Sequence, residues 1–135
     1  MNYLLDTNVI SQFSKKHPNE KALQWMMMAD TGSTWLSVIT LQEIRYGIEI
    51  MPSGKEKDKI ARWFEEDLQG EFFDRILPVD AKIADISARL LARAKKFSGL
   101  EMDALIAATA IANAMQVVTL NSADFERLGI EVISF

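Results

Sequence analysis

Residues 103–120 read DALIAATAIANAMQVVTL, and they constrain the architecture more than any other part of the chain. Residues 103–115 predict a helix that is apolar on nearly every face, and such a helix must be buried. Residues 116–120 predict a strand, and a short helix at 122–128 and a strand at 130–134 follow. This alternation is typical of a parallel sheet covered by helices on both faces.

The rest of the chain alternates in the same way. Short apolar runs predict further strands at 2–5, 34–38 and 75–77. Helices are predicted at 7–14, 19–30, 40–48, 55–68 and 80–99, with Thr40 at the start of the third, Gly99 as the C-cap of the last and Met26 to Met28 as core residues. The fold class is therefore α/β, a three-layer α/β/α sandwich with a central parallel sheet, as one domain over residues 1–135.

Composition narrows the chemistry that this chain can perform. It has no cysteine, which excludes disulfides and thiolate ligands, and its one histidine, His17, excludes multi-histidine metal sites. No segment approaches the roughly 18 to 20 apolar residues that cross a membrane, and no signal peptide is recognisable, so we expect a cytoplasmic protein. The net charge of −4 disfavours nonspecific binding to nucleic acid, although bound divalent ions would offset it.

Four acidic residues have equivalent places relative to the predicted strands. Asp6 directly follows the first strand, Glu43 lies early in the helix after the second, and Asp124 lies in the helix after residues 116–120. Asp103 starts the helix that leads into that same strand. Ligand sites of open α/β sheets lie outside the carboxyl ends of the strands, where the strand order reverses. We therefore expect these four acids to meet at one rim of the sheet.

Each acid also has a purely structural explanation. Asp6 and Asp103 both stand where a helix N-cap is expected. The segment TLQE at 40–43 fits a capping box, and NSAD at 121–124 fits the start of the last short helix. These explanations apply to single positions, whereas the joint placement at one rim favours a functional site.

Four segments resemble the motifs of the PIN-domain family. They are LLDTNVI at 4–10, LSVITLQEI at 36–44, DALIAATA at 103–110 and VTLNSADF at 118–125, and they occur in the family's order. The length and the style of the motifs resemble the VapC toxins of bacterial VapBC toxin–antitoxin pairs. Two positions depart from the family pattern: Leu120 stands where an arginine is frequent, and Asn121 where some relatives carry a further acid.

The resemblance implies a metal-dependent endoribonuclease that hydrolyses RNA and is the toxin of a type II toxin–antitoxin system. Its cofactor would be Mg²⁺ or Mn²⁺, and its partners would be a small cognate antitoxin and a second copy of the chain, or a larger toxin–antitoxin assembly. Operator DNA would be bound only through the antitoxin. The family's acidic positions fall on Asp6, Glu43, Asp103 and Asp124, with Thr7, Asn8, Thr119 and Asn121 beside them as supporting residues.

An all-carboxylate site suits Mg²⁺ or Mn²⁺, because these hard cations prefer oxygen ligands. Asp6 and Asp103 are expected to be direct ligands. Glu43 would hold a water of the ion's shell or act as general base, and Asp124 would complete the shell or bind a second ion. Glu101 is either an outer acid of the same site or a solvated charge at a helix start.

Two other functions stay open at this stage. A phosphotransfer domain would use Asp6 as an aspartyl nucleophile, but such enzymes usually carry a second Asp where this chain has Asn8. A catalytically inactive PIN-like binding module would keep the acidic rim only for contacts with partners. A partner surface or a satellite core is predicted from the apolar residues Ile60, Trp63, Phe64, Phe72 and Phe73, and phosphate contacts from Lys15, Lys16, Arg45, Arg93, Lys95 and Lys96.

Overall fold

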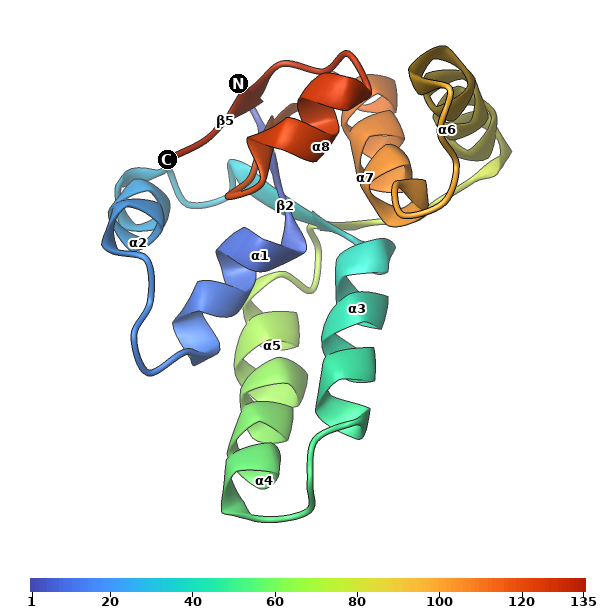
Figure 1. Ribbon diagram of the computed structural model, residues 1–135. Helices are drawn as coiled ribbons and strands as arrows, with labels where there is room; N and C mark the ends of the chain where they lie inside the picture. Colours follow the sequence, from blue (N-terminus) through green and yellow to red (C-terminus); the bar gives the residue numbers. More distant parts are fainter.

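The computed structural model describes residues 1–135 and contains one five-stranded sheet (Figure 1). Its strands are β1 (Tyr3–Leu5), β2 (Thr34–Ser37), β3 (Ile76–Leu77), β4 (Gln116–Val118) and β5 (Val132–Ile133). All neighbouring strands are parallel, in the order β3-β2-β1-β4-β5. The direction in which strands are added reverses between β1 and β4. The predicted parallel α/β architecture is therefore confirmed.

Helices connect the strands and cover both faces of the sheet (Figure 1). They are α1 (Thr7–Ile10), continued by a 3₁₀ turn (Ser11–Ser14), α2 (Glu20–Met28), α3 (Val38–Glu49), α4 (Lys55–Arg62), α5 (Gln69–Glu71), α6 (Ala81–Ala94), α7 (Glu101–Ala112) and α8 (Ser122–Arg127). A π-helical segment, Trp63–Leu68, joins α4 to α5. No helix combines the length and the hydrophobicity that a membrane crossing requires.

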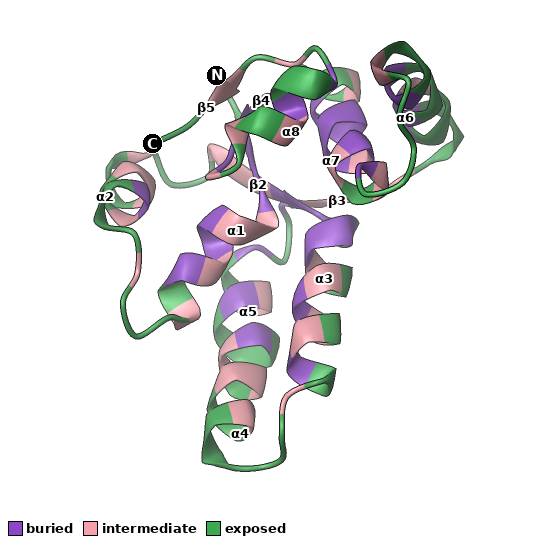
Figure 2. Cartoon of the chain, in the orientation of Figure 1, coloured by how far each residue is buried: buried purple, intermediate pink, exposed green.

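Two hydrophobic cores lie on opposite faces of the sheet. Leu4 and Val117 pack in the core beneath α6, α7 and α8, while their neighbours Leu5 and Val118 pack in the core beneath α1, α3 and the segment 63–72. Successive side chains of a strand point to opposite faces, so short apolar strands supply both cores at once. The helix α7 is buried along most of its length, as its composition predicts (Figure 2).

Three predicted helix boundaries are wrong. α3 begins at Val38, with the Ser37 hydroxyl accepting the N–H of Ile39 at 3.0 Å, instead of at Thr40. α7 begins at Glu101, two residues before Asp103. α6 ends at Ala94, because Lys95 adopts φ +54° and closes the helix there instead of Gly99. Helix ends depend on local caps that periodicity does not reveal.

The methionine run of α2 does not pack as predicted. Met26 is half-buried, but Met27 is 76% exposed and Met28 is 86% exposed. The helix α2 lies outside α1 and presents this side to solvent (Figure 2).

The apolar residues after Pro52 are divided between the core and the surface, and those that are buried join the core on one face of the sheet instead of a satellite core. Phe64 and Phe72 are buried against α1 and α3 together with Leu68. Ile60 and Trp63 are only partly buried, and Phe73 is 78% exposed.

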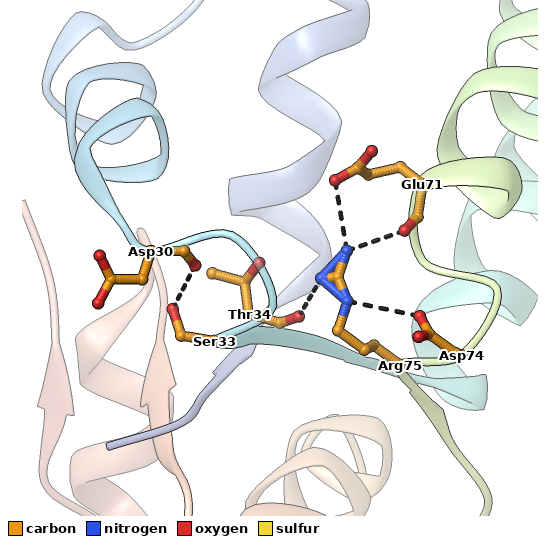
Figure 3. Close-up of polar contacts among 6 residues, drawn as sticks. All are labelled: Asp30, Ser33, Thr34, Glu71, Asp74 and Arg75. Carbon is orange, nitrogen blue, oxygen red and sulfur yellow. Dashed lines mark hydrogen bonds and ion pairs between the residues drawn. The ribbon is translucent and has the colours of Figure 1, made fainter.

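A buried arginine connects this region to the sheet (Figure 3). Arg75 Nη1 donates to the carbonyl of Thr34 at 3.1 Å, and Nη2 donates to the carbonyl of Glu71 at 2.8 Å. Its guanidinium also forms ion pairs with the carboxylates of Glu71 and Asp74 and lies 4.6 Å from the ring centre of Phe72. The side chain thereby fixes the start of β2 against the end of α5.

Replacing Arg75 with methionine is expected to lower the free energy of unfolding by about 3 kcal/mol, because it leaves two carbonyls without a donor in a buried setting. Arg89→Met is the matched control. Arg89 also forms an ion pair, with Asp85, but the side chain of Arg89 is 75% exposed. The free energy of unfolding should therefore fall by less than about 1 kcal/mol in this variant. Urea denaturation of both variants measures the difference. Equal losses would contradict the role given to Arg75.

Candidate functional site

The buried carboxyl of Asp6 lies at the point where the strand order reverses. Asp6 follows β1 and is 5% exposed. Its Oδ1 accepts the N–H of Thr7 at 2.8 Å, so it caps α1 as one interpretation predicts. Its Oδ2 accepts the hydroxyl of Thr119 at 2.7 Å, from the segment after β4. Asp6 is therefore both a helix cap and a group held across the two strands where α/β proteins bind ligands.

Thr7 connects α1 to α3. Its Oγ1 donates to Glu43 Oε1 at 2.7 Å and lies 3.0 Å from the hydroxyl of Thr40. Thr40 and Glu43 stand three residues apart in α3 and so share one face of that helix. The side chain of Glu43 is thus directed to the rim that carries Asp6.

The segment after β4 is fixed to α1 by the side chains of Asn8 and Thr119. Asn8 Oδ1 accepts the N–H of Leu120 at 3.0 Å, and Asn8 Nδ2 lies 3.5 Å from Thr119 Oγ1. Thr119 Oγ1 also accepts the N–H of Asn121 at 2.9 Å. These bonds hold the Thr119 hydroxyl in place for its contact with Asp6. Leu120 is partly buried and packs against the core beneath α1.

The remaining two acids face each other from α7 and α8. Asn121 Nδ2 donates to Asp124 Oδ2 at 2.8 Å, which orients that carboxylate. Besides burial, Asp124 raises the pKa of Asp103, so these two carboxyls lie close to each other. The four residues Thr7, Asn8, Thr119 and Asn121 all contact either an acid of the group or the segment that carries one.

The pKa shifts show that the four acids are electrostatically coupled. Burial, followed by the negative charges of Asp6, Asp124 and Glu43, raises the pKa of Asp103 from its ordinary 3.8 to about 7. Burial also raises the pKa of Asp6, although hydrogen bonds from Thr119 and Thr7 oppose the shift and the charges of Glu43 and Asp124 add to it. The charges of Glu43 and Asp124 act on both Asp6 and Asp103, so the four carboxyls lie near one another.

The rim is open to solvent beside this group. A hollow there is lined by Glu43, Gly99, Glu101, Met102 and Asp103. Glu101 thus lies next to two of the four acids instead of apart from them. No set of three or more acidic or histidine side chains is already arranged to hold a metal ion. The donor set nevertheless has the chemistry that Mg²⁺ and Mn²⁺ require, since it consists of carboxylate oxygens with uncompensated negative charge.

Two of the four capping explanations are wrong, those for Glu43 and Asp103, whereas the segment 121–124 does start α8, although no side chain caps it. The N-cap of α3 is Ser37, so Glu43 is not part of a capping box. Leu100 occupies the cap position of α7, which places Asp103 inside the first turn. Asp124 likewise lies inside the first turn of α8, after Asn121. Their carboxylates are therefore not used as caps.

Sequence reasoning missed two polar residues that support the site. Thr40 was assigned as a helix cap, but its fully buried hydroxyl contacts Thr7. Gln12 is also buried, and it donates to the carbonyl of Asn8 at 2.9 Å and accepts the N–H of Asn19 at 2.8 Å. The spacing of Thr40 three residues before Glu43 was the only available signal for its place.

Two curated proteins are similar to almost the whole chain. The plasmid stability protein StbB of Pseudomonas syringae pv. tomato is 39% identical over 97% of this chain and 96% of its own length. The VapC ribonuclease Y4jK of Sinorhizobium fredii is 34% identical over 97% of this chain and 95% of its own length.

Two solved structures have the same fold. FitAcB from Neisseria gonorrhoeae superimposes with a TM-score of 0.89 at 32% identity, covering 98% of this chain and 96% of that chain. DNA-bound VapBC from Salmonella typhimurium superimposes with a TM-score of 0.77 at 26% identity, covering 99% and 98%. The PIN domain family matches residues 3–131. This chain therefore belongs to the PIN-domain family.

Proposed function

We propose that this protein is an endoribonuclease that hydrolyses RNA phosphodiester bonds with the help of Mg²⁺ or Mn²⁺. One observation carries the proposal: burial, together with the charges of Asp6, Asp124 and Glu43 from remote segments, raises the pKa of Asp103 to about 7. Such repulsion costs stability, and a bound divalent cation would offset it. The name of the relative Y4jK as a VapC ribonuclease supports the same activity.

The site residues divide into ligands and helpers. We assign Asp6 and Asp103 as direct ligands of the ion, because Asp6 is buried, Asp103 is half-buried, and the charge of Asp6 acts on Asp103. When bound, the ion would supply Lewis-acid activation and neutralise charge at the phosphate. Glu43 would hold the attacking water or accept its proton, and Asp124 would complete the ligand set or bind a second ion.

The supporting residues orient these carboxylates. Thr119 and the backbone of Thr7 fix both oxygens of Asp6, so its free lone pairs face the rim. Asn121 does the same for one oxygen of Asp124. Carboxylates that are held by hydrogen bonds lose less entropy on binding an ion, which is the usual purpose of such partners.

We further propose that the protein acts in the cytoplasm as the toxin of a type II toxin–antitoxin pair. A small cognate antitoxin would neutralise it, operator DNA would be bound only through that antitoxin, and the toxin would form homodimers or a larger assembly with it. The VapBC structure from Salmonella typhimurium, which is DNA-bound, supports this arrangement.

A hollow between the 3₁₀ turn after α1 and the helix α4 supports the proposal of a protein partner. Partly buried Ile60 and Trp63 line it together with the exposed Phe13, while Lys15 and Lys16 stand at its border. An antitoxin segment with apolar residues would cover these side chains. In this arrangement Lys15 and Lys16 would contact the antitoxin instead of RNA phosphates.

Asp6→Asn tests the proposed activity most simply. Asparagine caps a helix as well as aspartate does, so α1 should keep its start while the ligand charge is lost. Cleavage of assorted RNAs in Mn²⁺ is expected to fall by at least about 100-fold, and chelator should abolish it in the wild type. Asp80→Asn is the matched control, because Asp80 caps α6 through the N–H of Ile83 and does not belong to the acidic group.

Two results would contradict the proposal. Cleavage that persists in chelator or in Asp6→Asn would mean another mechanism or a contaminating nuclease. A trapped acyl-phosphate on Asp6 would instead support the phosphotransfer domain, although Asn8 is engaged with the N–H of Leu120 and is not free to assist such chemistry. Protein that binds a partner but never cleaves RNA would be an inactive binding module.

A further inference from the structure

We infer that Thr40 is a positioning residue for Glu43 and acts through the hydroxyl of Thr7. The inference rests on the proposed function, because it concerns how one acid of the proposed site is held. Thr40 is fully buried and touches neither the rim nor the proposed ion. Its hydroxyl lies 3.0 Å from that of Thr7, whose own oxygen lies 2.7 Å from Glu43 Oε1.

The direction of these two hydrogen bonds follows from counting protons. A hydroxyl has one proton to donate, and an ionised carboxylate can only accept. The proton of Thr7 is therefore given to Glu43, and the proton of Thr40 must be given to Thr7. Two hydrogen bonds in line polarise each other, so the donor at the end of the chain strengthens the contact at the carboxylate.

A second buried threonine makes a different bond. Thr109 in α7 is also fully buried, and its hydroxyl donates to the carbonyl of Leu105, four residues back, at 2.7 Å. This is the usual bond of a threonine within a helix. Thr40 stands in the first turn of α3, so the residue four back lies in β2 and its helix offers no such carbonyl. Its hydroxyl contacts Thr7 of α1 instead.

Two consequences follow for Glu43. Without Thr40, the Thr7 hydroxyl can rotate and the carboxylate of Glu43 is less firmly directed to the rim. Mutation of a residue that orients a metal ligand or a base through a hydrogen bond typically lowers metal affinity or activity by roughly 10- to 100-fold. Because Thr40 is fully buried and cannot touch RNA, the KM for RNA should change little.

The experiment compares Thr40→Val with Thr109→Val, since valine fits both sites and removes only the hydroxyl. Thr40→Val is expected to lower kcat for RNA cleavage and the apparent affinity for Mn²⁺ by about 10-fold each, with KM for RNA nearly unchanged. Thr109→Val should lower the Tm but leave both quantities as in the wild type. Thr40→Ser, which restores the hydroxyl, should recover most of the loss.

A double-mutant cycle with Glu43→Ala identifies the route of the effect. Because Thr40 acts only through Glu43, Thr40→Val should cause no further loss of Mn²⁺ affinity or kcat in the Glu43→Ala protein. The inference is overturned if Thr40→Val changes the Tm alone, as Thr109→Val does, or if its effect is the same with and without Glu43.

Failure of the proposed function would be seen separately, as wild-type protein that neither cleaves RNA nor binds Mn²⁺. The metal-free proteins then decide the inference by thermal unfolding. The drop in Tm caused by Thr40→Val should be smaller in the Glu43→Ala protein than in the protein that keeps Glu43. Equal drops would overturn the inference.

Discussion

Asp103→Asn is expected to lower RNA cleavage by about 1,000-fold and, in chelator, to raise the Tm of the protein by about 4 °C. The loss of activity follows from removing a proposed direct ligand of the catalytic ion. The gain in stability follows from the coupling of the acids, because asparagine adds no charge beside Asp6, Asp124 and Glu43. Asp103 is only half-buried, so solvent screening limits the gain to about 1 kcal/mol.

The same substitution should change how stability depends on pH. The pKa of Asp103 is about 7 in the folded protein, against an ordinary 3.8. Between these values the folded state binds more protons than the unfolded state. The free energy of unfolding must therefore fall as the pH rises from about 4 to about 7, and it must level off above that range. Asp103→Asn should show a smaller fall over this window.

Thermal unfolding in chelator from pH 4 to pH 8, together with an RNA cleavage assay, measures both effects. Asp85→Asn is the control, because Asp85 is exposed and pairs with Arg89 on α6. That variant should keep the activity and the pH dependence of the wild type. An inactive Asp103→Asn protein that is also less stable in chelator at pH 8 would argue against repulsion among the acids.

Mn²⁺ at 5 mM is expected to raise the Tm of the wild-type protein by about 8 °C. An ion that binds only the folded state stabilises it according to its affinity, and a dissociation constant of roughly 0.1 mM corresponds to about 2 kcal/mol. The ion would also offset the neighbouring charges that, after burial, contribute to the raised pKa of Asp103 and Asp6. Thermal shift in buffers of equal ionic strength measures the effect and controls for general screening.

Asp6→Asn provides the matched comparison for this shift. The variant should lose most of the rise in Tm, whereas Asp80→Asn should keep it. A wild-type Tm that does not respond to Mn²⁺ or Mg²⁺ at millimolar concentration would count against an ion site at the rim.

Much of the fold is predictable because it depends on patterns of period two and period 3.6. Apolar runs such as Tyr3–Leu5 and Gln116–Val118 are too short to be anything but buried strands between helices. The apolar helix before β4 predicts a sheet that is covered by helices. Two cores lie on the two faces of the sheet, which explains why that helix is apolar and why Leu4 and Leu5 pack on opposite faces. The meeting of the four acids followed from topology, since each stands at a carboxyl strand end or at a helix start on the same edge.

The remaining features depend on contacts between remote residues or on single caps. The N-cap of α3 is Ser37 and not Thr40. Thr40 and Glu43 therefore do not form a capping box, and their side chains contact Thr7 instead. The exposure of Met27 and Met28 likewise reflects which side of α2 meets the core, since Trp25 and Met26 pack there instead. Buried hydrogen bonds such as that of Thr119 with Asp6 span more than a hundred residues and need the assembled fold.

In the proposed catalytic site, carboxylates from four segments of the chain surround one divalent ion. Diffraction from a crystal soaked in Mn²⁺, recorded at a wavelength where manganese scatters anomalously, locates that ion directly. We predict a peak at the rim, with oxygens of both Asp6 and Asp103 about 2.1 Å from the ion. A protein that cleaves RNA but shows no ion there, or binds Mn²⁺ through other residues, would contradict this account.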